Sequence, residues 1–102
     1  MNVQDLAEAR RRGDDVILLD VREPEELAIA KVEGAVHIPM RQVPARIAEL
    51  DRGRRIVVMC HHGMRSAQVA GFLREQGFAQ VENLDGGIDA WAAVVDPSVR
   101  RY

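Results

Sequence analysis

This sequence has little cysteine, few aromatic residues, no excess of basic residues and no long apolar run. Each of these features argues against a class of protein. One cysteine, Cys60, cannot form an internal disulfide bond, which fits the reducing cytoplasm. Four aromatic residues and a net charge of −2 offer neither the stacking platforms nor the positive surface of a nucleic-acid-binding protein. The longest apolar run, 90–95, is far shorter than the roughly 20 residues of a membrane-spanning helix. The first residues also lack the basic and apolar regions of a secretory signal.

The remaining composition is that of an ordinary globular protein. Hydrophobic residues make up 47% and charged residues 29% of the 102 residues, which is enough apolar material for a core and too much for intrinsic disorder. The length is close to the most common domain size, and no repeat, low-complexity segment or Gly/Ser linker divides the chain. We therefore expect one domain spanning residues 1–102, located in the cytoplasm.

Short apolar runs alternate with amphipathic segments along the chain. The runs predict strands at 16–19, 36–38, 56–60 and 81–84. The segments between them predict helices from Val3 to before Gly13, from Pro24 onward, over 44–50, from near Ser66 to Gly77, and after Gly86-Gly87 through Trp91. This alternation predicts an α/β fold with a mostly parallel sheet of four to five strands and helices on both faces.

The most informative segment follows the strongest strand signal, 56–60. Cys60 ends this run, and the next helix is predicted to begin near Ser66. In open parallel sheets, ligands bind beyond the carboxyl ends of the strands, where loops lead into helix N-termini. Gly63 can adopt a positive φ that turns the N–H groups of the loop inward, and Arg65 adds a permanent cation. Together with the helix N-terminus, these groups favour a thiolate at Cys60 and an anionic substrate beside it.

A structural role for Cys60 is the alternative. A lone cysteine at the end of an apolar strand is usually inert core filler, because cysteine is among the most buried residue types. Here the strand, the glycine-containing loop, the arginine and the helix start occur together, and this combination favours a reactive Cys60.

The segment Cys60–Ser66 resembles the active-site loop of the single-domain rhodaneses, the thiosulfate sulfurtransferases. Three further stretches resemble other motifs of that family and occur in the same order: Leu19–Glu23, Glu33–Pro39, and Asn83–Gly87 followed by Trp91. The resemblance therefore covers most of the chain, from about Val16 to Trp91. It implies a small rhodanese-like α/β domain.

The resemblance also implies a chemistry. Cys60 is then the nucleophile, which takes a sulfur atom from a small-molecule donor, thiosulfate or a persulfide, and carries it as a persulfide. A thiophilic acceptor, cyanide or a thiol (including a protein thiol), then removes the sulfur. The implied substrate-binding residues, acting through their backbone N–H groups, are His61, His62, Gly63, Met64, Arg65 and Ser66. Arg65 additionally binds the anionic donor or steadies the loop. No cofactor, nucleic acid or membrane is implied.

The length of the loop distinguishes sulfur transfer from phosphate chemistry. Phosphatases and arsenate reductases of similar fold have five residues between cysteine and arginine, whereas this chain has four, 61–64. A shorter loop suits one sulfur atom better than a tetrahedral oxyanion. Sulfur transfer is therefore favoured over phosphate hydrolysis.

Other candidate residues are interpreted more simply. The neighbouring His61 and His62 do not indicate a metal site, because no second cysteine or Cys-x-x-Cys pair completes a set of ligands. We expect them to line the mouth of the site, with Met64 as its apolar part. Asp20 and Arg22 are expected to form a buried ion pair that supports the structure at a strand end.

Two functions from different classes remain open. The first is a sulfurtransferase that uses a Cys60 persulfide. The second is a rhodanese-like interaction or sulfur-carrier module with little turnover on thiosulfate. Modules that have lost activity typically lack the cysteine, and this chain retains it within a complete loop, which favours the enzyme. The role of the segment after Asp96, whether packed on the surface or used in a dimer contact, is left open by the sequence.

Overall fold

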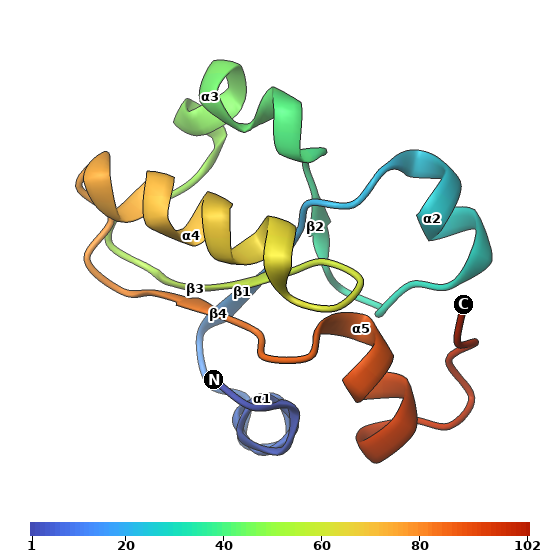
Figure 1. Cartoon of the computed structure of the whole chain (residues 1–102). Helices are drawn as coiled ribbons and strands as arrows, with labels where there is room; N and C mark the ends of the chain where they lie inside the picture. The colour runs from blue at the N-terminus through green and yellow to red at the C-terminus, as the bar shows by residue number, and fades with distance from the viewer.

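A computed structural model describes all residues, 1–102, and contains one parallel four-stranded sheet in the order β2-β1-β3-β4 (Figure 1). The strands are β1 (Val16–Asp20), β2 (Val36–His37), β3 (Arg55–Met59) and β4 (Val81–Asn83). The helices are α1 (Val3–Arg12), α2 (Pro24–Ile29), α3 (Val43–Arg46), α4 (Met64–Glu75) and α5 (Gly87–Ala90). Turns of 3-10 helix, Met40–Gln42 and Ile47–Glu49, flank α3, and a π-helical turn, Trp91–Val95, extends α5. The predicted α/β class, with four parallel strands, is confirmed.

Strand β3 lies at the centre of the sheet because it is apolar on both faces. Its side chains from Ile56 to Met59 are all buried. Ile56 and Val58 pack into one core cluster, while Val57 and Met59 pack into the other, as the alternation of side chains along a strand requires. The sheet therefore separates two apolar layers.

Helices cover both layers, as the sequence predicted. Helix α4 lies over one face of the sheet and α1 and α5 lie on the other (Figure 1). Val69 and Leu73 of α4 contribute to the first layer, and Leu6 of α1 and Ile88 of α5 contribute to the second. None of the helices combines the length and the apolar character that spanning a lipid bilayer requires.

Several predicted boundaries require correction. Cys60 is the first residue after β3 and not its last, and α4 begins at Met64, two residues before Ser66. The helix predicted over 44–50 is instead one α-helical turn followed by a 3-10 turn from Ile47, because its short amphipathic stretch packs only at Val43, Ile47 and Leu50.

At the C-terminal end of the chain, the predicted helix through Trp91 continues to Val95. Beyond it, the segment 96–102 turns back toward α2, where Tyr102 bonds Arg22 (Figure 1). The segment therefore packs on this molecule's own surface.

Candidate active site

The candidate site forms where the carboxyl ends of β3 and β4 meet the start of α4. Cys60 directly follows β3, and the short connection 61–63 leads to α4. Gly63 has a φ of 112° and forms the N-terminal cap of this helix, a conformation that side chains with a Cβ rarely adopt. Because the turn is so tight, residues 63–66 wrap around the sulfur of Cys60.

The sulfur of Cys60 accepts hydrogen bonds from this turn. The N–H of Gly63 lies 3.1 Å from Sγ, and the hydroxyl Oγ of Ser66 lies 3.3 Å from it. Burial by itself raises the pKa of the thiol, but the hydroxyl of Ser66 and the backbone N–H groups of Ser66, Gly63 and His62 more than offset it. The net result is a lowered pKa at Cys60.

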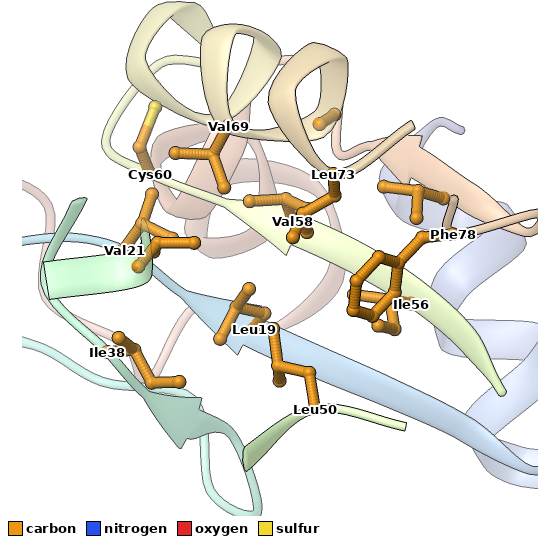
Figure 2. Close-up of a cluster of buried hydrophobic side chains, with 13 residues drawn as sticks. Leu19, Val21, Ile38, Leu50, Ile56, Val58, Cys60, Val69, Leu73 and Phe78 are labelled. Atoms are coloured by element: carbon orange, nitrogen blue, oxygen red, sulfur yellow. The ribbon is translucent and has the colours of Figure 1, made fainter. Parts of the chain in front are cut away.

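Cys60 is nevertheless enclosed. The residue is 1% exposed and belongs to the core cluster that α4 covers. Figure 2 shows it at one end of this cluster, with its sulfur directed toward the α4 ribbon. The largest hollow of the molecule, about 390 Å³, lies elsewhere, bordered by residues such as Arg10, Trp91 and Val99. The chemistry of the loop, and not the size of a cavity, identifies the candidate site.

Helix α5 holds the loop from the other side. The N–H of Ile88 donates to the carbonyl of Cys60 at 2.9 Å, and the N–H of Asp89 donates to the carbonyl of His61 at 3.1 Å. A Cβ placed on Gly87 would lie 2.5 Å from both carbonyl oxygens, so only glycine permits this approach. With their carbonyls bound by α5, the peptides at the start of the loop have a defined orientation.

Arg65 lies in the first turn of α4 and forms a two-pronged ion pair with Glu26 of α2, at 2.9 and 3.0 Å. Its guanidinium also interacts favourably with a negative charge on Cys60. The arginine therefore connects α4 to α2 and places a positive charge near the thiol. Its predicted role in binding the donor stays a prediction.

The residues expected at the mouth of the site differ in exposure. Met64 is 78% exposed, and the side chain of His62 is 62% exposed and lies 3.9 Å from Asp89. The ring of His61 instead lies between the rings of His62 and Tyr102, at centroid distances of 3.9 and 3.8 Å. The C-terminal segment thus covers His61, which the sequence did not indicate.

Asp20 and Arg22 lie behind the site and form a buried ion pair, with 2.8 Å between a guanidinium nitrogen and a carboxylate oxygen. Arg22 is fully buried and also donates to the carbonyl of Ala30 and the hydroxyl of Tyr102, each at 2.8 Å. This network joins the end of β1 to the end of α2 and to the C-terminal segment. Neither residue forms a hydrogen bond with Cys60. No group of three or more His, Cys, Asp or Glu side chains is arranged to hold a metal ion.

Sequence reasoning missed three residues of the site. Glu26 and Tyr102 contact it only because α2 and the C-terminal segment fold toward it, and no sequence pattern signals either contact. Asn83 accepts a hydrogen bond from Ser66 Oγ at 2.5 Å and donates one to the carbonyl of Gly63 at 3.2 Å. Its position near the carboxyl end of the predicted strand 81–84, which the structure pairs with β3, is a signal that could have identified it.

The chain belongs to the rhodanese-like domain family, which matches residues 2–94. The structure resembles the crystal structure of a rhodanese-related protein from Thermoplasma volcanium, with a TM-score of 0.87 and 31% sequence identity, covering 100% of this chain and 97% of that one. The family resemblance inferred from the motifs is therefore confirmed.

Two curated relatives are named for sulfur transfer. A sulfurtransferase of Allochromatium vinosum is 42% identical over 79 residues, which is 78% of this chain and 74% of that protein. The thiosulfate sulfurtransferase GlpE of Pseudomonas aeruginosa is 34% identical over 91 residues, which is 89% of this chain and 81% of that protein. The chain is thus similar to sulfurtransferases over most of its length.

Proposed function

We propose that this protein is a sulfurtransferase that carries a sulfur atom as a persulfide on Cys60. The observation that carries the proposal is the pair of hydrogen bonds to Sγ, from the Gly63 N–H and the Ser66 hydroxyl, at the start of a helix. These donors favour the thiolate, which is the nucleophilic form of cysteine. The similarity to named sulfurtransferases supports the same reading.

The proposed reaction has two covalent steps. The Cys60 thiolate attacks the outer sulfur of thiosulfate or of a persulfide donor, a new S–S bond forms, and the donor's S–S bond breaks. Sulfite, or the donor's thiolate, leaves with the bonding electrons. Cyanide or an acceptor thiolate, which a protein can supply, then attacks the outer sulfur of the persulfide. The Cys60 thiolate leaves and is ready for the next donor.

The residues around Cys60 have separate proposed roles. The N–H groups of 61–66 stabilise negative charge on the thiolate and on the outer sulfur of the persulfide. The cation of Arg65 attracts the anionic donor. The loop has four residues between Cys60 and Arg65, which suits one added sulfur atom better than a phosphoryl group. A reducing compartment such as the cytoplasm keeps the thiol available between cycles.

The second candidate is a rhodanese-like interaction or sulfur-carrier module with little turnover on thiosulfate. Cys60 is 1% exposed, so a small donor must displace covering groups before it reaches Sγ. This enclosure favours the module. The two candidates differ in whether a small donor loads the cysteine.

Intact-mass measurement of the protein after incubation with thiosulfate tests the proposal. We expect a gain of one sulfur atom, its loss when cyanide is added, and no gain in Cys60→Ser. The Cys60→Ser variant should retain the thermal unfolding curve of the wild type, because serine has nearly the same size.

The other outcomes are equally informative. No gain in a protein whose Cys60 reacts with an alkylating reagent would support the module instead. A Cys60 that resists alkylation in the folded state would mark it as an inert core residue. A Cys60→Ser variant with full activity would show that another group carries the sulfur.

A further inference from the structure

The side chain of Asn83 makes two contacts with groups that surround Cys60. Its Nδ2 donates to the carbonyl oxygen of Gly63 at 3.2 Å, and its Oδ1 lies 2.5 Å from the hydroxyl oxygen of Ser66. A carbonyl oxygen only accepts hydrogen bonds, so the amide nitrogen must face Gly63 and the amide oxygen must face Ser66. The orientation of the amide is therefore determined by the chemistry of its neighbours.

Ser66 consequently has two acceptors for one proton. Its Oγ lies 2.5 Å from Asn83 Oδ1 and 3.3 Å from Cys60 Sγ, and a hydroxyl group donates only one hydrogen bond. Ser66 is fully buried, and Asn83 is partly exposed. Whichever acceptor receives the proton, the other loses the hydrogen bond from Ser66.

The direction of the hydroxyl follows the charge on the cysteine sulfur. When Cys60 is a thiol, its S–H can donate to Ser66 Oγ while Ser66 donates to Asn83. When Cys60 is a thiolate, Sγ only accepts, and the Ser66 proton is drawn toward it. In a persulfide the negative charge moves to the outer sulfur, so Ser66 can again donate to Asn83. The sulfur and the amide oxygen thus compete for the Ser66 proton when Cys60 is a thiolate.

We propose that Asn83 is a positioning residue for the chemistry of Cys60: its amide oxygen competes with Sγ for the Ser66 proton while its amide nitrogen holds the carbonyl of Gly63. This inference deepens the proposed function, on which it rests. The side-chain hydrogen bonds of Asn83 go to Ser66 and Gly63 and not to Sγ, so it acts through these two residues. Its place at the end of β4, paired with Val58 of β3, sets its amide beside the loop.

Substitution of Asn83 separates its two contacts. Asn83→Ala removes the competing acceptor, so the Ser66 hydroxyl is free to donate to the thiolate. We expect the pKa of Cys60 to fall by about one pH unit, which is about tenfold in the thiol–thiolate equilibrium. Asn83→Asp retains an acceptor and adds negative charge, so we expect the pKa of Cys60 to rise. Both variants lose the donor to Gly63, so opposite shifts of the pKa in the two variants do not come from that loss.

Other charged and titratable groups lie around the site, and all of them are retained in these variants. They come from the end of β1, α2, the loop, α4, α5 and the C-terminal segment: Asp20, Arg22, Glu26, His61, His62, Arg65, Asp89 and Tyr102. Their contribution is therefore common to the wild type and the variants. A difference in titration reports the change at Asn83.

The measurement is the ultraviolet absorbance of the Cys60 thiolate as a function of pH. It requires no sulfur donor, so it gives a result even if thiosulfate fails to load the cysteine, and the two proposals fail separately. Ser66→Ala supplies the control: in that background Asn83→Ala should no longer shift the pKa, because the shared proton is absent. The near-isosteric Asn83→Asp keeps the test valid if Asn83→Ala unfolds, and a thermal melt checks each variant.

Three outcomes would overturn the proposal. The first is an unchanged or raised pKa of Cys60 in folded Asn83→Ala. The second is an equal shift with and without the Ser66 hydroxyl, which would place the effect at Gly63 or in the fold at large. The third is a lowered pKa in Asn83→Asp.

Discussion

Cys60 combines two properties that usually exclude each other. It packs in an apolar core cluster, which by itself keeps a thiol neutral, and it also accepts hydrogen bonds from Gly63 and Ser66. The hydrogen bonds prevail, and the pKa of the thiol is lowered. At the scale of single residues, reactivity therefore depends on a few donors within about 3 Å of one sulfur atom.

Arg65 is the residue whose role is most open to a kinetic test. We expect Arg65→Ala to raise the apparent KM for thiosulfate by about tenfold, because a hydrogen-bonded cation near Cys60 is lost, with a smaller change in kcat. Steady-state sulfur transfer to cyanide measures both constants. Glu26→Gln is the matched control, since it removes the ion-pair partner and keeps the cation. An unchanged KM in Arg65→Ala would show that the arginine only joins α4 to α2.

Among the elements, the short helix α5 has a large part in holding the loop that carries Cys60. It spans only Gly87–Ala90, yet its N–H groups bind the carbonyls of Cys60 and His61. The contact requires the backbone of α5 to approach the loop without an intervening Cβ at Gly87. The loop is thus held between α4, which supplies donors to the sulfur, and α5, which binds the carbonyls behind it.

Gly87→Ala tests this arrangement. The new Cβ would lie 2.5 Å from the carbonyl oxygens of Cys60 and His61, at a backbone φ of 60°, so α5 must move away from the loop. We expect a loss of about 1–3 kcal/mol in the free energy of unfolding and about a tenfold fall in sulfur transfer. Chemical denaturation and a cyanide assay measure the two effects.

Gly71→Ala is the control for Gly87→Ala. Gly71 lies within α4, and a Cβ there has no neighbour within 4 Å. Alanine is a better helix former than glycine, so this variant should be stabilised by up to about 1 kcal/mol and keep its activity. Wild-type activity in Gly87→Ala would show that the loop does not depend on α5.

At the scale of the whole molecule, polar contacts between segments far apart in the sequence connect the elements that surround the site. Arg65 of α4 pairs with Glu26 of α2, and Arg22, near the start of α2, bonds Tyr102 at the end of the chain. Arg101 pairs with Asp89 of α5 at 3.0 Å. These contacts link the two sides of the sheet at its carboxyl edge. Global stability and the geometry of the site are therefore coupled through charge.

The pH dependence of stability tests this coupling at Glu26. Burial pushes the pKa of Glu26 upward, but the hydrogen bonds from Arg65 and from the backbone of Glu23 outweigh it and leave the pKa lowered. A carboxylate with a lower pKa in the folded chain stabilises the fold above its ordinary pKa. That contribution is lost as the pH falls through the folded-state pKa.

Glu26→Gln should therefore be less stable than the wild type near neutral pH, and its free energy of unfolding should fall less steeply in acid. Urea denaturation over a series of pH values measures both. Glu25→Gln, which changes an exposed neighbour in the same helix, should follow the wild-type curve. Parallel curves for wild type and Glu26→Gln would show that the pair with Arg65 contributes little to folding.

Much of the fold could be predicted because its signals are local. The apolar run 56–59 identified the central strand, and Gly13 marked the end of α1, where it adopts a φ of 76°. The start of α4 was placed two residues late because Gly63 caps the helix without a side chain, a feature that composition does not reveal. The helix predicted over 44–50 was wrong in part because four to seven residues do not determine which helical turn tertiary packing selects.

By itself, the sequence determined the α/β class, the succession of strands and helices along the chain, the loop 60–66 and the family, because apolar periodicity and loop motifs lie in consecutive residues. Only the tertiary structure decided which distant groups meet at that loop. Glu26 reaches Arg65, Tyr102 reaches His61, and Asn83 reaches Ser66, across separations of 39, 41 and 17 residues. Such contacts depend on the way parallel strands and their crossovers bring distant segments together, and of the three only the strand-end position of Asn83 is signalled in the sequence.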